Sequence, residues 1–206
     1  GYYGHYCFLP LYVFCGEHVL VSYLRQANQD GARHAGAIMR LLIKRLRQVW
    51  PDVRIIIRAD SGFCRRPLMH WCESNQVKYL IGLAKNDRLV DDLSYEKMAV
   101  LYQACRNYKM KRLRWYETRS YQAHSWHRPR QVIAKLEVTE KGYNPRFVVT
   151  NLEGEARELY KRYCLRGDME NRIKEQQLDL FADRTSCTWW WQNQLRLCLS
   201  SLAYVL

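Results

Sequence analysis

The chain has 206 residues, of which 48% are hydrophobic and 13% aromatic, and this composition excludes a disordered or collagen-like protein. Lys and Arg total 33 against 20 Asp and Glu, so the net charge is +13. That excess favours a polyanionic partner, with nucleic acid ahead of an anionic membrane surface. The length suits one domain with a sizeable core.

The cysteine pattern argues against a zinc-binding or secreted protein. None of the eight cysteines has CxxC spacing, and no His joins a Cys at zinc-finger spacing. Scattered cysteines inside apolar runs are typical of reduced thiols in a cytosolic protein. No apolar run reaches membrane-spanning length. Because the chain opens with Gly1 and soon enters a strand-like run, we expect a fragment whose beginning is missing.

The first half of the chain alternates between strand and helix patterns. A β-hairpin is predicted over residues 5–28 with Gly16 at its turn, and a helix follows between Asp30 and Pro51. Residues 53–60 are then predicted to form a central strand, residues 65–76 a helix, and residues 77–86 the next strand. This alternation predicts an α/β sheet.

The second half changes character along its length. We expect a helix over residues 88–114, and then alternating apolar runs over about 115–150 that indicate a β-rich insertion or extra strands. Residues 154–180 are predicted to form one long polar helix, and residues 189–206 a final, largely buried helix with Trp189, Trp190 and Trp191 in the core. With no repeat or linker, we interpret residues 1–206 as a single domain with an insertion.

Asp60 directly follows the short apolar run of residues 53–59. In open α/β sheets, loops and ligands gather at the carboxyl ends of the strands. The competing interpretation is an N-cap for the helix beginning near Pro67, although Asp60 lies too far upstream for that role. On its position alone, a structural role for Asp60 is favoured over a functional one.

A second group of polar residues falls on one stripe when residues 160–184 are placed on a helix at 100° per residue. The stripe consists of Tyr163, Arg166, Glu170, Lys174 and Gln177. A solvated ladder of ion pairs is the competing interpretation, and spacing alone favours it slightly. Gly167 argues against it, because a glycine inside a helix costs roughly 1 kcal/mol relative to alanine. Close approach of another backbone or a ligand would explain the glycine.

Three segments carry a resemblance to a known family. "GYYGHYCFLPLYVFCGEH", "IIIRADSGF" and "YCLRGDMENRIKE" resemble the DDE transposases of bacterial insertion sequences, group one, over essentially the whole chain. The resemblance implies an RNase H-like catalytic domain, an α/β fold with a mixed sheet flanked by helices. It also implies three acidic residues that hold two divalent ions, Mg²⁺ or Mn²⁺. Asp60 matches the second acid, and Glu170 matches the third within a Tyr-x2-Arg-x3-Glu motif formed by Tyr163 and Arg166.

The sequence departs from the family pattern in two places. The first aspartate of the family belongs on a strand upstream of the first hairpin, and this chain begins after it. The lysine expected seven positions after the glutamate is Gln177, which leaves Lys174 as the nearest basic residue on the stripe. We therefore assign Asp60 and Glu170 as catalytic metal ligands and expect the fragment to be inactive by itself.

The stretch from Arg106 to Lys135 has the composition of a nucleic-acid surface. It carries nine cations against one acid, with Lys111, Arg112 and Arg114 close together and five Tyr and Trp residues interleaved. Cations contact phosphates, and exposed aromatic rings stack on bases. The competing interpretation is that the aromatic rings face the core and the cations face water, and for any single ring we expect core packing.

Taken together, the sequence predicts part of a transposase that cleaves and transfers DNA strands with divalent metal ions. The expected partner is DNA, as insertion-sequence ends and target, bound by Tyr163, Arg166 and Lys174 together with the cations at 111, 112 and 114. The resemblance implies a cytoplasmic, nucleoid-associated bacterial protein whose parent is a dimer in the transposition complex. The alternatives are a non-enzymatic DNA-binding remnant and another RNase H-like nuclease, such as a junction resolvase.

Overall fold

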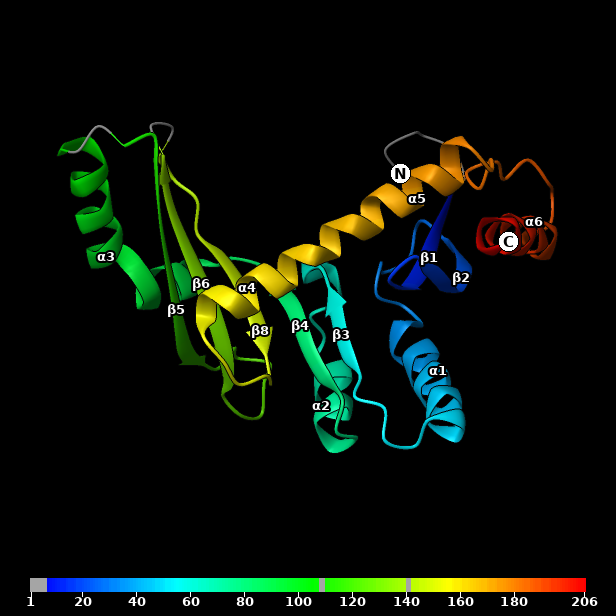
Figure 1. The fold of residues 1–206 in the computed structure, drawn as a ribbon, viewed down its shortest axis with the longest axis horizontal. Coiled ribbons are helices and arrows are strands. Elements are labelled where there is room, and N and C mark those ends of the chain that lie inside the picture. Colours follow the sequence, from blue (N-terminus) through cyan, green and yellow to red (C-terminus); the bar gives the residue numbers. More distant parts are fainter. Residues whose placement is uncertain (1–6, 108–109, 140–141) are drawn as a thin grey trace. The chain divides into compact units, whose positions relative to one another are not determined.

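The computed structural model describes residues 7–107, 110–139 and 142–206, with the backbone alone for residues 92–97. The chain divides into two compact units (Figure 1). The larger unit is Met39–Leu165, and the smaller one combines Gly1–Ile38 with Arg166–Leu206. Each unit has a hydrophobic core of its own.

A mixed sheet is the centre of the larger unit. Its strands follow one another in space in the order β3 (Ile56–Ala59), β4 (Lys78–Leu83), β8 (Arg146–Thr150), β6 (Arg130–Thr139) and β5 (Arg112–Tyr121), and β7 (Gly142–Tyr143) pairs with β6. Strands β3 and β4 are parallel, and the other pairings are antiparallel. The structure is therefore mixed α/β with a mixed sheet flanked by helices, as the sequence predicted.

Helices cover both faces of this sheet, because successive side chains of a strand point to opposite faces. On β4, Tyr79 and Ile81 pack into one core and Leu80 into the other. The first core also receives side chains from α1 (Ala35–Val49), α2 (Arg66–Ser74) and α3 (Asp87–Asn107), and the second receives them from α4 (Ala156–Cys164). Asp60 directly follows β3 at its carboxyl end.

Several expectations for this unit are confirmed and two are wrong. The β-α-β alternation of residues 53–86 is present as β3, α2 and β4. The predicted helix over residues 88–114 ends at Asn107, and Arg112 already begins β5, which pairs with β6 over ten residues. Among the described strands β3 pairs only with β4, so it lies at an edge of the sheet, and β4 is its buried neighbour on the inner side. Strands do occupy much of residues 115–150; that they form an insertion stays a prediction.

The smaller unit is built on a hairpin. Strands β1 (Phe8–Cys15) and β2 (His18–Gln26) are antiparallel and joined through Gly16, whose φ of 58° suits a glycine. Helix α6 (Trp190–Val205) follows the outer edge of β2, where the Gln194 side chain accepts from the Leu24 amide at 2.6 Å and the Trp190 indole donates to the Leu24 carbonyl at 3.0 Å. These bonds satisfy backbone groups of a strand edge. The hairpin predicted over residues 5–28 is confirmed for its described part, residues 7–28.

The predicted burial of the last helix is wrong. Trp189 and Trp191 are each 62% exposed, and Leu195, Leu199 and Leu202 are also more than half exposed. Helix α6 is apolar on several sides, but in its own unit it packs on a two-stranded hairpin that can cover only one of them. Its buried apolar residue is Leu197, which packs with Tyr12, Leu24 and Ala182.

The long helix predicted over residues 154–180 is interrupted. Between α4 and α5 (Asp168–Leu178), residues Leu165–Gly167 form a 3₁₀ turn, η2. Because a 3₁₀ turn has 3.0 residues rather than 3.6, three such residues rotate the following side chains by about 60° relative to a continuous α-helix. The predicted stripe therefore does not run unbroken through Gly167.

In the described part of the chain, no helix is long and apolar enough to cross a membrane.

Candidate functional site

Asp60 directly follows β3 and caps the short 3₁₀ turn that comes next. Its Oδ1 accepts a hydrogen bond of 2.8 Å from the Gly62 amide and so caps η1 (Ser61–Phe63). The cap on the helix near Pro67 was correctly rejected, since that helix begins at Arg66 and has Arg65 at its N-cap. Within the described residues, Oδ2 of Asp60 receives no hydrogen bond. The exposed carboxylate is thus oriented by one bond and keeps one open oxygen.

Tyr163 lies beside this carboxyl end of β3, and Gly82 makes the approach possible. A Cβ added at Gly82 would lie 2.7 Å from the Tyr163 hydroxyl, 2.9 Å from the Ser61 amide nitrogen and 3.3 Å from the carbonyl carbon of Asp60. The hydroxyl of Tyr163 and the Asp60–Ser61 backbone therefore meet over β4 in the larger unit. Sequence reasoning missed Gly82, although a glycine inside a strand pattern is a sign of close backbone approach.

A hydrogen bond joins β3 to α4 one turn before Tyr163. The Arg58 side chain, two residues before Asp60, donates to the Arg162 carbonyl at 3.1 Å. On α4, Leu159 and Tyr160 are buried against the sheet, with Tyr163 packed partly on the same core. These contacts fix the helix on the strands that carry Asp60.

The remaining residues of the predicted motif belong to the smaller unit. On α5, Glu170 accepts a 3.2 Å hydrogen bond from Arg166, four residues before it, and the Glu170 side chain is 59% exposed. Lys174 is exposed and forms no ion pair among the described residues. The ion-pair interpretation is thus correct for Arg166 and Glu170. Asp60 and Tyr163 meet in one unit, whereas in the other Arg166 lies in η2 and Glu170 and Lys174 lie on α5.

The steric argument for Gly167 is not supported. Its φ is −58°, and a Cβ added there would meet no described atom within 4 Å outside its own helix neighbourhood. Neither its conformation nor packing against the described residues requires a glycine at that position. Among the described residues there is also no group of three or more His, Cys, Asp and Glu side chains that could hold a metal ion.

The cations at Arg112 and Arg114 share one carboxylate with Lys135. Glu137 pairs with Arg114 directly across the β5–β6 ladder at 2.7 Å, with Lys135 at 2.8 Å and with Arg112 at 3.7 Å. Burial raises the pKa of Glu137, but the hydrogen bonds from Lys135 and Arg114 outweigh it and lower the pKa to about 2. Part of the positive charge that was predicted to bind DNA is therefore neutralised by Glu137 within the sheet. Glu137 lies two residues beyond the end of the basic stretch at Lys135, so the charge count over that stretch did not include it.

A second carboxylate, Glu73 on α2, gathers three partners. It accepts from the Tyr79 hydroxyl at 2.8 Å, from Arg130 at 2.7 and 3.0 Å, and pairs with Arg128 at 2.6 Å. Burial raises the pKa of Glu73, but hydrogen bonds from Arg130, Tyr79 and Arg128 lower it to about 2. This network joins α2, β4 and β6, and its role is structural.

The aromatic residues of the basic stretch mostly pack inside the unit, as expected for single rings. Tyr121 and Trp126 are buried, with ring centroids 5.8 Å apart, and Tyr116 packs on Tyr160. Trp115 is the exception among the described rings of this stretch, with 48% of its surface exposed. Tyr108 and Lys109 lie outside the described residues. Lys111 is exposed, immediately before β5.

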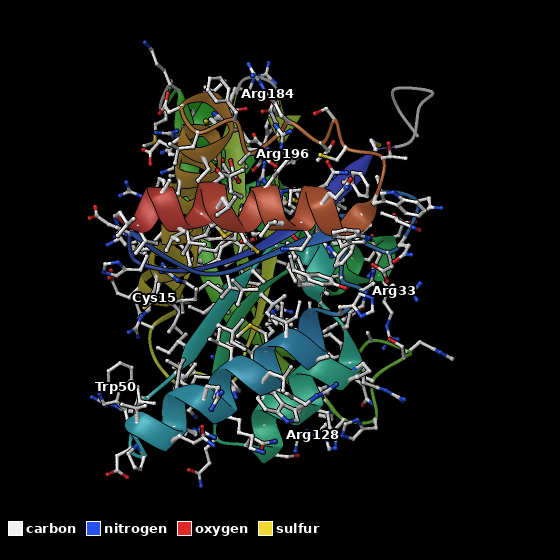
Figure 2. The ribbon with its side chains drawn as sticks, turned by 90° about the vertical axis from the view of Figure 1, so that its right-hand side faces the viewer. Cys15, Arg33, Trp50, Arg128, Arg184 and Arg196 are labelled. Carbon is white, nitrogen blue, oxygen red and sulfur yellow. The ribbon has the colours of Figure 1, made fainter. Side chains whose placement is uncertain are left out.

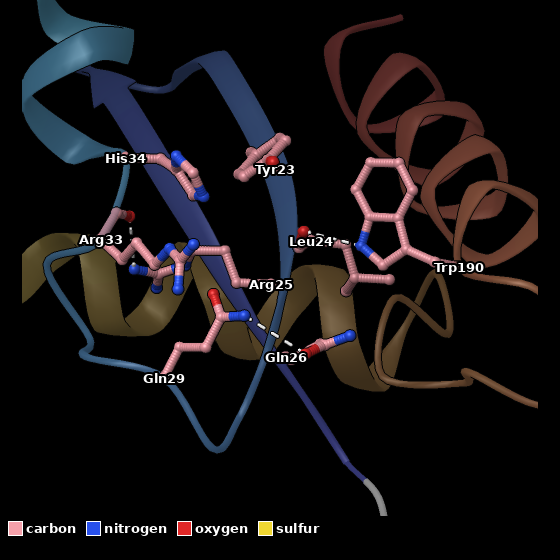
Figure 3. A pocket seen from close by; sticks show the side chains of 8 residues that line it. All are labelled: Tyr23, Leu24, Arg25, Gln26, Gln29, Arg33, His34 and Trp190. Atoms are coloured by element: carbon pink, nitrogen blue, oxygen red, sulfur yellow. Dashed lines mark hydrogen bonds between the residues drawn. The ribbon is translucent and has the colours of Figure 1, made fainter.

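A small hollow of about 270 Å³ opens on the hairpin of the other unit (Figure 3). Tyr23, His34 and Trp190 line it, with Tyr23 in edge contact with both other rings. The buried Arg25 guanidinium at its base donates to the backbone carbonyls of Leu9 and Gly31. These bonds hold the loop after β2, so the role of Arg25 at this position is structural.

Comparison with models of protein families gives a match. The family described as "Transposase DDE domain group 1" matches residues 1–206, the whole chain. A search among curated proteins finds no significant match.

Proposed function

This chain belongs to the group 1 family of transposase DDE domains, and from that premise we propose that it serves metal-dependent cleavage and transfer of DNA strands at insertion-sequence ends. The observation that supports the proposal is the Asp60 carboxylate: exposed at the end of β3, oriented by the Gly62 amide, and flanked by the Tyr163 hydroxyl across Gly82. Family membership supports a role in transposition, and the reaction at Asp60 is our extension of it.

The donor set at Asp60 fits Mg²⁺ or Mn²⁺. Mg²⁺ takes oxygen ligands, keeps several waters, and is usually held by one or two carboxylates plus substrate phosphates. Asp60 offers a hard oxygen that no described protein donor occupies, and we propose Glu170 as the second carboxylate. A pair of such ions stabilises the attacking and leaving oxygens of an in-line displacement at phosphorus.

The protein side chains would act by holding and orienting. Asp60 would hold a metal ion through Oδ2 while its Oδ1 stays fixed by the Gly62 amide. Tyr163 would donate its hydroxyl to a phosphate or sugar oxygen beside that position, and Arg166 would keep Glu170 in one rotamer through their 3.2 Å hydrogen bond.

We also propose phosphate contacts outside the carboxylates. They are Lys174 on α5 and the group Lys111, Arg112 and Arg114. Arg114 donates its Nε to Glu137, and a guanidinium carries five N–H donors, so others stay available for phosphate.

The experiment compares the response of three proteins to Mn²⁺ in thermal unfolding: the wild-type chain, Asp60→Asn, and Asp52→Asn. Asp52 is an exposed carboxylate of the same unit outside the candidate site, so its variant matches the charge change. A metal ion at tenfold excess over its Kd stabilises the folded chain by about 1.4 kcal/mol, which for this size raises Tm by roughly 3–6 °C. Wild type and Asp52→Asn should show this rise, and Asp60→Asn should not.

A second candidate function is DNA binding without metal chemistry. The observation in its favour is that the described residues contain no group of three or more metal-ligating side chains, whereas the net charge is +13. An equal Mn²⁺ response in wild type and Asp60→Asn would remove Asp60 from metal binding and select this second candidate.

A further inference from the structure

The positive charge of the chain is confined to one of its two units. Residues 39–165 contain 26 Lys and Arg against 13 Asp and Glu, which equals the whole net charge of +13. The remaining residues contain seven of each sign, so the smaller unit is neutral. A polyanion is therefore attracted to the larger unit, and the question becomes which of its cations are available.

Many of the cations singled out in the sequence are already paired. Arg112, Arg114 and Lys135 share Glu137, Arg128 and Arg130 share Glu73, and Arg119 pairs with Glu117. A guanidinium bonded to a carboxylate attracts a phosphate less strongly, because the pair is close to neutral at a distance.

Helix α1 presents the opposite case. It contains Arg40, Lys44, Arg45 and Arg47 and no acidic residue between Ala35 and Val49. In the described structure none of these four pairs with a carboxylate; Arg45 makes only a 3.4 Å hydrogen bond to Gln48. Arg40, Lys44 and Arg47 lie at i, i+4 and i+7, so they share one face. Met39 and Ile43, about a quarter turn around the helix from this face, pack into the core.

A merely solvated helix face would usually interleave acids with bases. Like charges at i, i+4 destabilise a helix, and α1 keeps such a pair in Arg40 and Lys44. Helices α4 and α5 do interleave acids, with Lys161 bonded to Glu158 and Arg172 to Glu175. The charge pattern of α1 therefore costs stability that an anionic partner would restore.

We propose that the α1 basic face, defined as Arg40, Lys44 and Arg47, docks on the phosphate backbone of duplex DNA. This inference rests on the proposed function, which names DNA as the partner. It adds the surface of the protein that contacts the DNA. From residue 40 to residue 47 the helix rises about 10.5 Å, a length over which one strand of duplex DNA advances by roughly three nucleotides at 3.4 Å of axial rise each. The three long side chains are therefore close enough together to reach neighbouring phosphates of one strand.

The test measures binding of the full chain to a labelled DNA duplex by fluorescence anisotropy over a range of salt concentrations. The variant Arg40→Gln/Lys44→Gln/Arg47→Gln is compared with Arg33→Gln/Arg184→Gln/Arg196→Gln, which removes the same charge from exposed cations of the neutral unit (Figure 2). Loss of three phosphate contacts makes the slope of log K against log[salt] shallower by about 2.7. The α1 variant should show this change, and the control variant should keep the wild-type slope.

The outcomes separate the two proposals. A wild-type chain with no salt-dependent DNA binding would overturn the proposed function together with this inference. A steep wild-type slope that the α1 variant leaves unchanged would overturn the α1 face and leave the function standing. Binding of phosphatidylserine vesicles, rather than duplex, through the same three residues would also overturn it. Because glutamine removes like-charge repulsion, the α1 variant should melt no lower than wild type, so weakened binding cannot be assigned to unfolding.

Discussion

Gly82 is the residue on which the geometry around Asp60 depends most directly. It lies in β4 where the end of β3 and the Tyr163 hydroxyl approach from two sides. We expect Gly82→Ala to destabilise the larger unit by about 1–3 kcal/mol, the usual cost of overpacking. The hydroxyl can move away from the new methyl, but the Ser61 amide nitrogen at 2.9 Å belongs to the backbone and cannot do so cheaply. Urea denaturation measures the difference.

Gly167 supplies the matched control for that substitution. Its backbone is helical, and a Cβ there meets nothing within 4 Å among the described atoms. Gly167→Ala should therefore be neutral or stabilising by up to about 1 kcal/mol, because alanine loses less backbone entropy on folding. If both variants behave alike, the crowding at Gly82 is not what limits that position.

The Glu73 network acts at the scale of whole elements, because it fastens helix α2 to β4 and β6. Glu73→Gln should destabilise the chain by about 3–5 kcal/mol at pH 7, since it leaves the buried Arg130 without its carboxylate. The pKa of Glu73 is lowered to about 2 in the folded chain, so its contribution is present above the unfolded pKa of about 4.3 and is lost as pH falls toward 2. The difference between wild type and variant should therefore shrink over that window.

Glu158→Gln is the control for this prediction. Glu158 also pairs with a cation, Lys161, but the pair is exposed on α4, and exposed pairs contribute about 0–1 kcal/mol. Denaturation of both variants at pH 7 and near pH 3 gives the comparison. A constant effect of Glu73→Gln across pH would show that its charge is not what holds α2 to the sheet.

The elements that could be predicted are those whose signals are local. Gly16 between two apolar runs indicates a hairpin, and Pro51 after a helical periodicity marks the end of α1. The start of β5 could not be predicted, because Arg112 to Arg114 become strand only through their pairing with residues 137–139. Strand propensity depends on such neighbours more than helix propensity does.

The same distinction between local and long-range signals applies to the residues of the candidate site. Asp60 could be predicted because a carboxylate at a strand end is visible in the sequence. The role of Gly82 could not, since it depends on a tyrosine 81 positions later in the chain. Glu137 as a partner of Arg114 depends likewise on the β5–β6 register. The burial predicted for Trp189 and Trp191 was wrong because apolar composition does not reveal how much surface is available to cover a helix.

At the scale of the whole molecule, lysine reactivity offers a test that covers both units at once. Nine of the ten lysines lie in residues 39–165, and Lys174 is the one in the neutral unit. We expect duplex DNA to lower the acetylation rate of Lys44 and Lys111, because phosphate contacts would cover these exposed amines. Buried Lys135, bonded to Glu137 at 2.8 Å, should react slowly with or without DNA and so serves as an internal reference.

The acetylation rate of Lys174 tests whether the motif on α5 contacts DNA. If it replaces the usual motif lysine, its acetylation should also fall when DNA is added, although its unit carries no net charge to attract DNA. Mass spectrometry of peptides after acetylation with and without duplex gives the ratio for each lysine. Protection of Lys44 without protection of Lys174 would confine the contact to the larger unit, whereas protection of Lys174 alone would contradict the charge argument. At high salt the protection should disappear, because the release of counterions from DNA favours binding less as the salt concentration rises.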